Sequence, residues 1–464
     1  MRRLRQGLKN GSMRRLSGPA SPAQPWRNWA GNVSANPRRV AAPASADEVA
    51  EQVRQAAEDG LTARMTGSGH SFTPTAASDG VLLRPGNLAA IRSVDVAAGT
   101  VTVEAGLPLH KLNSELLARG LSLANMGDIQ VQTVSGAIQT GTHGTGRDVG
   151  GMAAQVAGLE LVLADGRIVT CTADSPGGGL STPDGGPLNI FDAARVGLGA
   201  LGVVTAVTFR VVPAFLLEAR EEPMTWSQVI SHLDEYCDDN EHFEFYWFPH
   251  SESCLTKRNN RIDGMASPLP RWRYVLDDQF LSNSVFGVTC RLGKTLPAVI
   301  PAINSVAGKA LGSRTYSDAA YRVFTSPRRV RFKEEEYAVP RATLSDVLAE
   351  VRSLFRRRDW RISFPIEVRV TPPDDVWLST AYQRDSAYIA IHVFHSTPHE
   401  EYFGDIEAVM TSVGGRPHWG KMHTRNVDYL SGVYPRLSEF ISIRDALDPQ
   451  RTFGNDYLRQ VLGS

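Results

Sequence analysis

The sequence predicts a mixed protein of strands and helices that is divided into two or three domains. The chain has 464 residues, and a domain typically holds roughly 150. Predicted strands outnumber predicted helices and alternate with them irregularly. Near residue 216 the composition also changes, because a part rich in Gly, Ala and Val gives way to larger side chains and clustered arginines. We therefore expect a domain boundary there.

The first predicted element is a helix that starts after Ser45. Ser45 and Glu48 form a capping box, and apolar residues then recur at helical spacing until Gly60. A second helix is expected over 108–120, and an Asp165-Gly166 turn is expected to join two strands. The strands predicted in this half lie within residues 61–67, 80–85, 101–106, 159–171 and 199–213.

Charge argues against nucleic acid as a partner. The 49 basic and 49 acidic residues cancel, but the first acidic residue is Asp47, and residues 1–46 hold nine basic side chains. The remainder carries 40 basic against 49 acidic residues, a net charge near −9, whereas phosphate binding needs a concentrated basic surface on the folded part. Residues 1–25 are expected to form a disordered, solvated basic tail, with a tether to a membrane or to RNA as the alternative.

Membrane-spanning segments and structural metal sites are not predicted. No apolar run reaches the roughly 18 residues that cross a bilayer, and the N-terminus lacks the apolar core of a secretory signal. We expect a cytoplasmic location, with membrane association as an addition to it. The four cysteines form no CxxC pair and lie far apart, so neither a disulfide framework nor a zinc site is indicated.

A glycine-rich loop at 66–74, TGSGHSFTP, follows a predicted strand. Its glycines allow successive backbone N–H groups to converge on an anion, which is typical of a diphosphate cradle. Phe72 stands where a Rossmann fingerprint needs its third glycine, and Thr73-Pro74 discourages the helix that should follow. A nicotinamide site is therefore not expected.

Two further glycine-rich segments lie at 133–146, TVSGAIQTGTHGTG, and at 197–205, GLGALGVVT. Small residues let the backbone approach a large planar ligand. The interspersed Val134, Ala137 and Ile138 look like anchors in a core and argue against a flexible surface loop. Together with the loop at 66–74, these segments predict one extended cofactor.

These three segments resemble the FAD-binding domain of the vanillyl-alcohol-oxidase type of flavoprotein. RPHWGK at 416–421 is similar to the aldonolactone oxidoreductase branch, within which the likeness is greatest to L-gulono-1,4-lactone dehydrogenases, with D-arabinono-1,4-lactone and L-gulonolactone oxidases next. The resemblance implies an α+β fold of two lobes. It implies a PCMH-type FAD-binding domain at 26–215, a cap with an antiparallel sheet and flanking helices at 216–430, and a C-terminal segment at 431–464 that returns to the FAD domain.

By this resemblance His70 matches the histidine that many members join covalently to FAD, and a hydrogen bond to the pyrophosphate is the alternative. No cysteine lies between His70 and Cys171, so a second, cysteinyl bond is not expected. The residues expected to bind FAD are Thr66, Gly67, Ser68, Gly69, His70, Ser71, Gly127, Asp128, Thr133, Val134, Ser135, Gly136, Thr140, Thr142, His143, Gly144, Gly202 and Val203.

Glu367 and Arg369 lie two residues apart on the apolar predicted strand 364–370, so their side chains share one face. An ion pair on a sheet surface, which contributes little, is the structural alternative, but the apolar neighbours favour a buried face. In the resembled family this pair meets the substrate beside the flavin ring, and Lys421 corresponds to the family's active-site lysine.

These residue types suit the oxidation of a secondary alcohol, in which a hydride leaves the carbon while a base takes the hydroxyl proton. Arg369 and Lys421 can stabilise the negative charge that develops. Glu367 is the first choice of base. Lys421 as a neutral amine, with a pKa lowered by burial, is the alternative.

Five histidines, His392, His395, His399, His418 and His423, lie within 32 residues and invite a metal hypothesis. On the predicted strand AYIAIHVF, however, His392 and His395 face opposite sides, so no metal site is expected. The resemblance instead makes His392 a pocket residue that hydrogen-bonds the substrate.

Gly127 aligns with the family position where relatives differ in oxygen reactivity. Oxidase activity and dehydrogenase activity are therefore both retained as alternatives. Asp128 replaces the serine of alditol oxidases and disfavours open-chain polyols.

The predicted function is FAD-dependent oxidation of an aldono-1,4-lactone, best L-gulono-1,4-lactone, to a 2-keto lactone of ascorbate type. The electron acceptor is oxygen, a cytochrome or a quinone. The alternatives are an alditol or other sugar oxidase and a flavin-binding protein without turnover.

Overall fold

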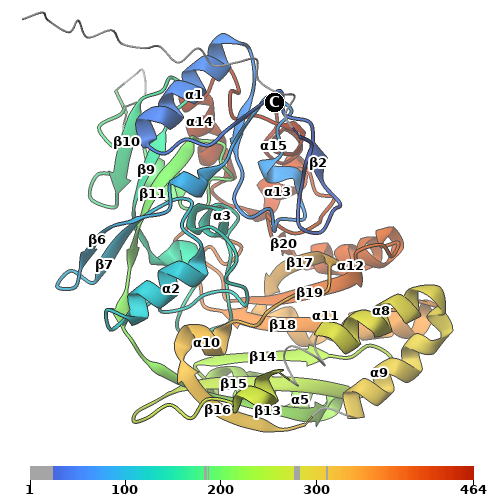
Figure 1. Ribbon diagram of the computed structural model, residues 1–464. Helices are drawn as coiled ribbons and strands as arrows, with labels where there is room; N and C mark the ends of the chain where they lie inside the picture. The colour runs from blue at the N-terminus through green and yellow to red at the C-terminus, as the bar shows by residue number, and fades with distance from the viewer. Residues whose placement is uncertain (1–23, 182–184, 187, 276–282, 310–311) are drawn as a thin grey trace, which may run out of the picture.

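The protein folds into two lobes that pack on each other (Figure 1). The computed structural model describes residues 24–181, 185–186, 188–275, 283–309 and 312–464. The predicted basic tail comprises residues 1–25. Residues 1–23 lie outside the described part of the chain, and only residues 24 and 25 are described. The mixture of helices with antiparallel sheet confirms the predicted α+β class.

Two sheets build the first lobe. The smaller is parallel, with the order β3 (Arg39–Ala41), β5 (Val81–Leu83) and β4 (Ala63–Met65). The larger is antiparallel, with the order β10 (Ile168–Thr172), β9 (Val156–Val162), β11 (Val203–Arg210), β7 (Thr100–Glu104) and β6 (Ile91–Asp95). Two short antiparallel pairs join β1 (Trp26–Arg27) to β2 (Ser34–Ala35) and β8 (Leu121–Ser122) to β12 (Val212–Pro213).

Local sequence signals account for the elements of this lobe. The helix α1 (Ala46–Glu58) begins at Ser45, whose side chain accepts a hydrogen bond from the backbone of Glu48, as the capping box predicts. The second predicted helix is α2 (Leu109–Leu117). Gly166, with φ of 80°, turns the chain from β9 into β10, because a left-handed residue is needed there.

The cap is organised by one eight-stranded antiparallel sheet. Its order is β16 (Arg314–Ala319), β13 (Leu216–Thr225), β15 (Ser253–Ile262), β14 (His242–Trp247), β18 (Ile366–Thr371), β19 (Ser386–Phe394), β17 (Phe332–Pro340) and β20 (Arg416–Pro417). Its first strand in the chain, β13, begins at Leu216, where the composition changes.

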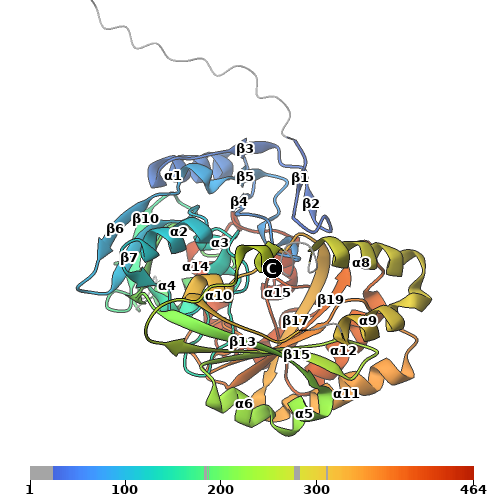
Figure 2. The same ribbon diagram turned by 60° about the horizontal axis from the view of Figure 1, so that its bottom comes forward.

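Side chains on the two faces of this sheet differ in character because they alternate along each strand. One face carries residues such as Phe245, Val368 and Ile389, which pack with the covering helices in one apolar core. Those helices are α5 (Trp226–Ser231), α6 (Leu233–Asp239), α11 (Leu344–Arg357) and α12 (Glu400–Ser412). Figure 2 shows α5, α6 and α11 outside the sheet. The opposite face carries charged residues, among them Glu244 and Glu367, and lines a cavity.

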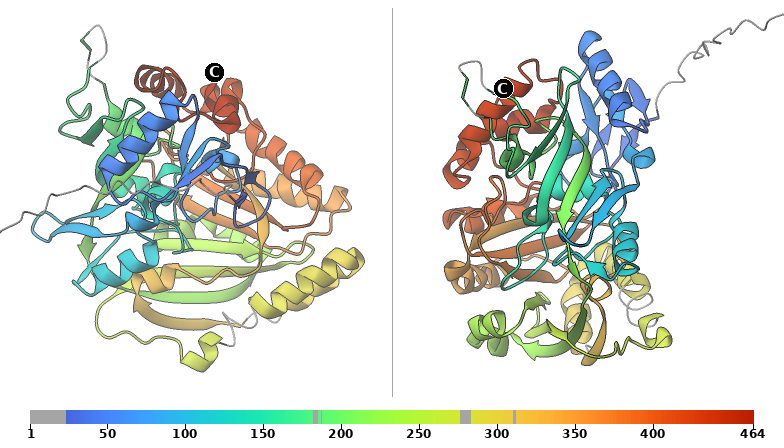
Figure 3. Two further views of the ribbon diagram at one scale, coloured as in Figure 1. Left: turned by 45° about the horizontal axis from the view of Figure 1, so that its top comes forward. Right: turned by 90° about the vertical axis from the view of Figure 1, so that its left-hand side faces the viewer.

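The C-terminal segment lies against the first lobe, as Figure 3 shows. It contains α13 (Val427–Val433), α14 (Leu437–Leu447) and α15 (Asp456–Leu462). Asn455 donates from its side-chain amide to the carbonyls of Pro74 at 2.9 Å and Ala77 at 3.0 Å. The backbone N–H of Ala63 donates to the carbonyl of Thr452 at 2.7 Å. The end of the chain therefore supports the loop at 66–74.

The remaining helices are α3 (Val134–Gln139), α4 (Ile190–Ala194), α7 (Arg271–Tyr274), α8 (Phe286–Thr295), α9 (Ile300–Lys309) and α10 (Ala320–Phe324). Of these, α8 and α9 lie at the outer edge of the cap (Figure 1). None of the helices in the described ranges combines the length and apolarity that a membrane crossing requires. All four cysteines are buried and free.

Candidate active site

A cavity of about 1750 Å³ lies between the two lobes. Its wall includes His70 and Asp128 from the first lobe and Glu367, Arg369 and Lys421 from the cap side of the chain. This volume exceeds the roughly 300–1,000 Å³ of a typical small-molecule pocket. The cavity is therefore large enough for an extended cofactor together with a substrate.

The glycine loops of the first lobe cross at very close range. A Cβ atom on Gly67 would lie 2.3 Å from the hydroxyl oxygen of Thr133, and one on Gly144 would lie 2.3 Å from the carbonyl oxygen of Met126. Gly69 has a φ of 71°, in the left-handed region that favours glycine. Glycine is therefore required at Gly67, where the Thr133 side chain fills the space, at Gly144, where the backbone of Met126 approaches, and at Gly69, where the backbone is left-handed.

The buried polar atoms beside these loops fit the expected cofactor. The side-chain oxygens Oε1 of Gln130 and Gln132 and Oγ1 of Thr66 are buried and have no hydrogen-bond partner among the described residues. Gln130 and Gln132 line the cavity. Because buried polar atoms are rarely left unsatisfied, these acceptors suit a ligand that brings hydroxyl and ring N–H donors, as FAD does.

The predicted cofactor residues divide into two groups. Seven of them line the cavity: His70, Ser71, Gly127, Asp128, Thr140, Thr142 and His143. The cavity lining does not include Thr66, Gly67, Ser68, Gly69, Thr133, Val134, Ser135, Gly136, Gly144, Gly202 or Val203. Several of this second group shape the loops instead. Thr133 caps α3 through a hydrogen bond from Gly136, and Ser135 donates to the carbonyl of Ala105.

The loop at 66–74 is joined directly to the segment that carries Lys421. The backbone N–H of Phe72 donates to the carbonyl of Gly420 at 2.7 Å, and the Thr73 hydroxyl donates to that of Trp419 at 2.8 Å. Lys421 is therefore fixed near His70. Burial lowers the pKa of His70 to about 4, and the charge of Lys421 contributes to this shift. The imidazole of His70 is consequently neutral near pH 7.

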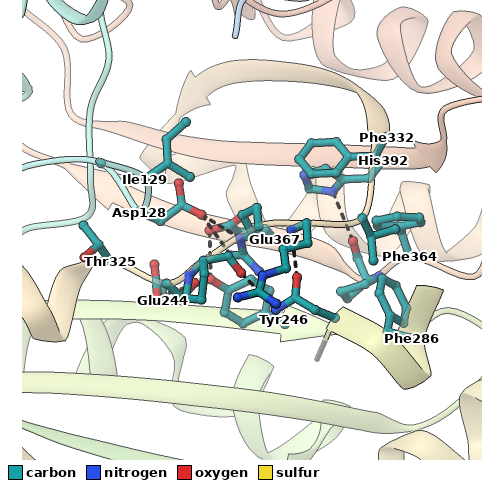
Figure 4. A pocket seen from close by; sticks show the side chains of 18 of the residues that line it. Asp128, Ile129, Glu244, Tyr246, Phe286, Thr325, Phe332, Phe364, Glu367 and His392 are labelled. Carbon is teal, nitrogen blue, oxygen red and sulfur yellow. Dashed lines mark hydrogen bonds and ion pairs between the residues drawn. The ribbon is translucent and has the colours of Figure 1, made fainter. Parts of the chain in front are cut away.

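We define the Arg369 cluster as Arg369, Glu367, Glu244, Asp128, Arg328 and Tyr246. The Arg369 guanidinium forms an ion pair with Glu367, and its Nε lies 3.0 Å from Oε2 of Glu244. Asp128 Oδ2 lies 3.7 Å from Nη2 of Arg369 and 2.8 Å from Nη2 of Arg328. Tyr246 donates to Oε1 of Glu367 at 3.1 Å. Figure 4 shows Asp128, Glu244, Tyr246 and Glu367 converging from both lobes.

The carboxyl groups of this cluster have pKa values that are shifted in opposite directions. Burial raises the pKa of Glu367 above its usual value of 4.5; Arg369 opposes this shift, whereas Asp128 and Glu244 add to it. For Asp128, burial is outweighed by Arg328 and Arg369, which lower its pKa. Glu367 is thus the carboxylate in the cluster that accepts a proton most readily. An exposed structural ion pair is excluded, because Glu367 and Arg369 are 6% and 8% exposed.

We define the Lys421 cluster as Lys421, Glu334, Glu336, His143 and His392. Lys421 Nζ forms an ion pair with Glu334 and lies 3.8 Å from Oε2 of Glu336. Glu336 Oε1 is 2.5 Å from Nε2 of His143, and Glu334 Oε1 is 3.4 Å from Nε2 of His392. Glu334 and Glu336 lie two apart on β17, so both reach the cavity face of the sheet.

The proposal of a neutral Lys421 is wrong. Burial on its own would lower the pKa of Lys421, but Glu334 and Glu336 outweigh this effect and raise the pKa above its usual 10.5. Two carboxylates that share one cation keep its proton in place. Lys421 is therefore a fixed positive charge at the edge of the cavity and cannot serve as the base.

Aromatic rings form the wall near His392. Its ring lies 5.1 Å from that of Phe332, edge to face, and 6.1 Å from that of Phe364, stacked. Phe286 from α8 packs on Phe364 at 4.8 Å. Figure 4 shows these residues apart from the carboxylates of the Arg369 cluster. Flat apolar surfaces of this kind suit a planar ring system.

The histidines do not converge on a metal. Within the described residues, no group of three His, Cys, Asp or Glu side chains could hold an ion. His395 lies just after the end of β19, where its backbone N–H donates to the carbonyl of Arg331, whereas His392 lies in the cavity wall. His423 is hydrogen-bonded to the hydroxyl of Tyr457.

The sequence reasoning missed several polar and charged cavity residues: Glu244, Tyr246, Arg328, Glu334 and Glu336. The signal for four of them was present. Residues 244 and 246 lie two apart in HFEFYWFPH, and residues 334 and 336 lie two apart in FKEEEYAVP, so that each pair shares one face when the segment forms a strand. Arg328 lies in an arginine cluster, and its pairing with Asp128, 200 residues earlier, leaves no local signal.

Sequence comparison identifies two families in this chain. The profile of a family described as D-arabinono-1,4-lactone oxidase matches residues 207–461, and that of an FAD-binding domain matches residues 37–172. The L-gulono-1,4-lactone dehydrogenase of Mycobacterium tuberculosis is 41% identical over 94% of this chain and 99% of its own length. The L-gulonolactone oxidase of Bos taurus is 32% identical, and the alditol oxidase of a Streptomyces species is 31% identical, each over 94% of this chain and 98% of the relative.

Solved structures agree on the fold. Cholesterol oxidase from Brevibacterium sterolicum superimposes with a TM-score of 0.79, covering 95% of this chain and 96% of that chain, at 16% sequence identity. A solvent-stable cholesterol oxidase gives a TM-score of 0.75 at 18% identity. This likeness confirms the two-lobed architecture expected from the resemblance. From the family profile and the full-length relatives, the chain belongs to the aldonolactone oxidoreductase family of FAD-dependent oxidoreductases.

Proposed function

We propose that this protein oxidises an aldono-1,4-lactone, best L-gulono-1,4-lactone, at a secondary hydroxyl to give a 2-keto lactone of ascorbate type. The observation that carries the proposal is the buried Glu367 and Arg369 pair, which faces the cavity shared with the glycine loops. The named activities of the relatives support a lactone as the substrate. FAD, when bound, supplies the hydride acceptor.

Glu367 has the properties of the base that removes the hydroxyl proton. Its pKa is raised by burial, so that it holds a proton more tightly than an ordinary glutamate and is better suited to take the proton of a hydroxyl. Arg369 and the hydroxyl of Tyr246 both contact Oε1 and so fix the orientation of the carboxylate. We propose that the substrate hydroxyl binds beside this group.

Arg369 and Lys421 supply permanent positive charge on the cavity wall. Each is surrounded by carboxylates that raise its pKa, so neither loses its proton near neutral pH. Fixed charges that need no reorganisation stabilise a developing negative charge most effectively when water is excluded. We propose that Arg369 stabilises the alkoxide character at the substrate oxygen and that Lys421 stabilises charge on the cofactor. His392 then binds another substrate hydroxyl.

Anaerobic mixing separates the lactone from the polyol hypothesis. The purified yellow protein is mixed with a panel of aldono-1,4-lactones and with xylitol, and bleaching of the visible flavin band is followed. We expect L-gulono-1,4-lactone to bleach the flavin faster than xylitol. The resemblance implies that Asp128, which is held by Arg328 near Arg369, stands where alditol oxidases have a serine. If no lactone causes bleaching, the proposed function is wrong.

We propose in addition that His70 carries FAD covalently. Its ring lies in the cavity wall, stacked on Trp29 at 5.1 Å, and its pKa of about 4 leaves a ring nitrogen unprotonated for bond formation. Acid precipitation of the protein is expected to leave flavin fluorescence in the pellet, and H70A is expected to release it. A colourless pellet from the unsubstituted protein would show that the cofactor is held without a bond.

The predicted domain limits are kept as part of this proposal: FAD binding by 26–215, substrate binding by 216–430, and support of the FAD lobe by 431–464. The two family profiles fall on either side of residue 207 and support this division. The electron acceptor, whether oxygen, a cytochrome or a quinone, is identified by comparing steady-state turnover with each. The cytoplasmic location stays a prediction.

A further inference from the structure

The helix α8 exposes its large apolar residues and buries its smallest ones. Val288 and Leu292 are 59% and 44% exposed, and they form one stripe with Val285 before the helix and Leu296 after it. We call these four residues the α8 stripe. The face turned toward the protein carries Gly287, Cys290 and Gly293. A surface helix normally does the reverse, with its larger apolar residues facing the core.

The exposed apolar residues of the described chain are concentrated in the stretch of sequence that contains this helix. Of the twelve large hydrophobic residues that are exposed in the described part of the chain, eight lie between residues 265 and 306. They are Met265, Trp272, Val275, Val285, Val288, Leu292, Leu296 and Val306. Single exposed apolar residues are common, but a stripe of four along one helix, as in the α8 stripe, marks a surface that binds something apolar.

The same stretch of sequence is strongly basic. Residues 264–331 contain ten basic and three acidic residues, in a chain whose part after residue 46 has a net charge near −9. Arg291 and Lys294 on α8 are exposed, and neither forms an ion pair with a described residue. Burial lowers the pKa of His395, and the charges of Arg331, Lys294, Lys333 and Arg291 lower it further, which places these four cations close together.

We propose that the α8 stripe and its flanking basic residues dock on the surface of an anionic lipid bilayer. An amphipathic helix with a basic flank inserts its apolar side into the interface, and anionic headgroups attract the cations beside it. A second copy of this chain is disfavoured as the occupant, because a two-fold interface would bring the same basic patch together from both subunits.

This docked arrangement has a consequence for the active site. Val285 and Val306 are exposed and also line the cavity that contains the Arg369 cluster, so the cavity reaches the same edge of the cap. Figure 1 shows α8 and α9 projecting at that edge. The bilayer would therefore lie beside one opening of the cavity. The inference rests on exposure and charge, and it is independent of which sugar the enzyme oxidises.

Vesicle sedimentation with the full-length, FAD-loaded protein tests the proposal. Vesicles of phosphatidylcholine are compared with vesicles that also contain phosphatidylglycerol. We expect binding mainly to the anionic vesicles, and a decrease in the partition coefficient of about tenfold or more for V288S/L292S and for R291E/K294E. None of these four residues lines the cavity, so the flavin colour and lactone turnover in solution should be unchanged.

Two matched controls make the test specific. V96S removes an apolar side chain that is 68% exposed on the first lobe, and K111E/R210E reverses two exposed charges on the same lobe, in α2 and at the end of β11. Both controls are expected to bind like the unsubstituted protein. Equal binding of V288S/L292S and V96S to the anionic vesicles would overturn the proposal. Any binding to the vesicles would then be assigned to other basic segments, such as residues 1–46. Light scattering that shows a dimer abolished by V288S/L292S would overturn the proposal in favour of a second copy.

Discussion

The Arg369 cluster and the Lys421 cluster lie in one cavity, but the pKa values of their carboxyl groups are shifted differently. In the Arg369 cluster, carboxylates from both lobes surround one guanidinium, and one of them, Glu367, has a raised pKa. In the Lys421 cluster, the two glutamates come from β17 alone, and burial is outweighed by Lys421 and neighbouring histidines, which lower both their pKa values. The first cluster can therefore accept a proton, and the second supplies a fixed charge.

The origin of the carboxylates adds a second difference. Asp128 belongs to the first lobe and pairs with Arg328 of the cap, so the Arg369 cluster depends on correct docking of the lobes. In the Lys421 cluster both carboxylates come from the cap, and the first lobe contributes His143. Residues 419–420 are joined to the first lobe by a hydrogen bond from the backbone N–H of Phe72 and by one from the Thr73 hydroxyl. The following predictions test this division, beginning with the largest expected effect.

R369A should cause the largest loss, because it leaves Glu367, Glu244 and Asp128 buried without their shared cation. Removal of one partner from a buried ionic network costs about 3–5 kcal/mol of unfolding free energy, and turnover should fall by at least about 100-fold. Chemical denaturation and steady-state kinetics measure both effects. In the control R261A, an exposed pair with Glu241 is lost, and the change should stay below about 1 kcal/mol. Equal stability of the two variants would contradict the account.

E367Q should lower kcat by about 10²–10⁴-fold, because the amide cannot accept the hydroxyl proton. The protein should keep its yellow colour, since Glu367 is assigned to the substrate. E244Q is the matched control: Glu244 also contacts Arg369, but its pKa is lowered, so the loss should be smaller. A larger loss in E244Q would transfer the role of base to that residue.

E334Q should alter the alkaline side of the pH profile. Glu334 raises the pKa of Lys421, so its removal lets Lys421 lose its proton at a lower pH, and activity should decline at a lower pH than in the unsubstituted enzyme. E335Q on the same strand should leave this limb in place, because Glu335 has no contact with Lys421 and its pKa is already raised by burial and Glu407. Identical alkaline limbs for E334Q and the unsubstituted enzyme would refute the role given to Lys421.

Y246F should have the smallest effect. The hydroxyl of Tyr246 donates to Glu367 and so stabilises its ionised form. Without it the pKa of Glu367 rises further, the acidic limb of the activity profile moves to higher pH, and turnover near neutral pH falls a few-fold, as expected for about 0.5–1.5 kcal/mol. A shift of the acidic limb toward lower pH would show that Tyr246 acts on another group.

Much of the fold and the identity of the central pair follow from local patterns. The capping box at Ser45 predicts α1, and the two-residue spacing of Glu367 and Arg369 predicts that their side chains share one face, as their places in the cavity wall confirm. Family resemblance adds His70 and Lys421, whose places in the cavity wall the structure reports. Their chemical roles stay predictions.

The remainder depends on contacts between distant segments. Asp128 was assigned to the cofactor, but its partners Arg328 and Arg369 lie 200 and more residues away in the chain. Lys421 was considered as a neutral amine because its partners Glu334 and Glu336 were not foreseen. Protonation states depend on such partners, and for this reason periodicity and spacing did not predict them.

The central claim is that Glu367 accepts the substrate proton in a cavity where Arg369 and Lys421 keep their charge. The most direct measurement is the rate of anaerobic flavin bleaching by L-gulono-1,4-lactone as a function of pH, in the unsubstituted enzyme and in E367Q. We expect an acidic limb above the usual glutamate pKa of 4.5 in the unsubstituted enzyme, and we expect this limb to disappear together with most of the rate in E367Q. Fast bleaching by E367Q with the same limb would contradict this claim.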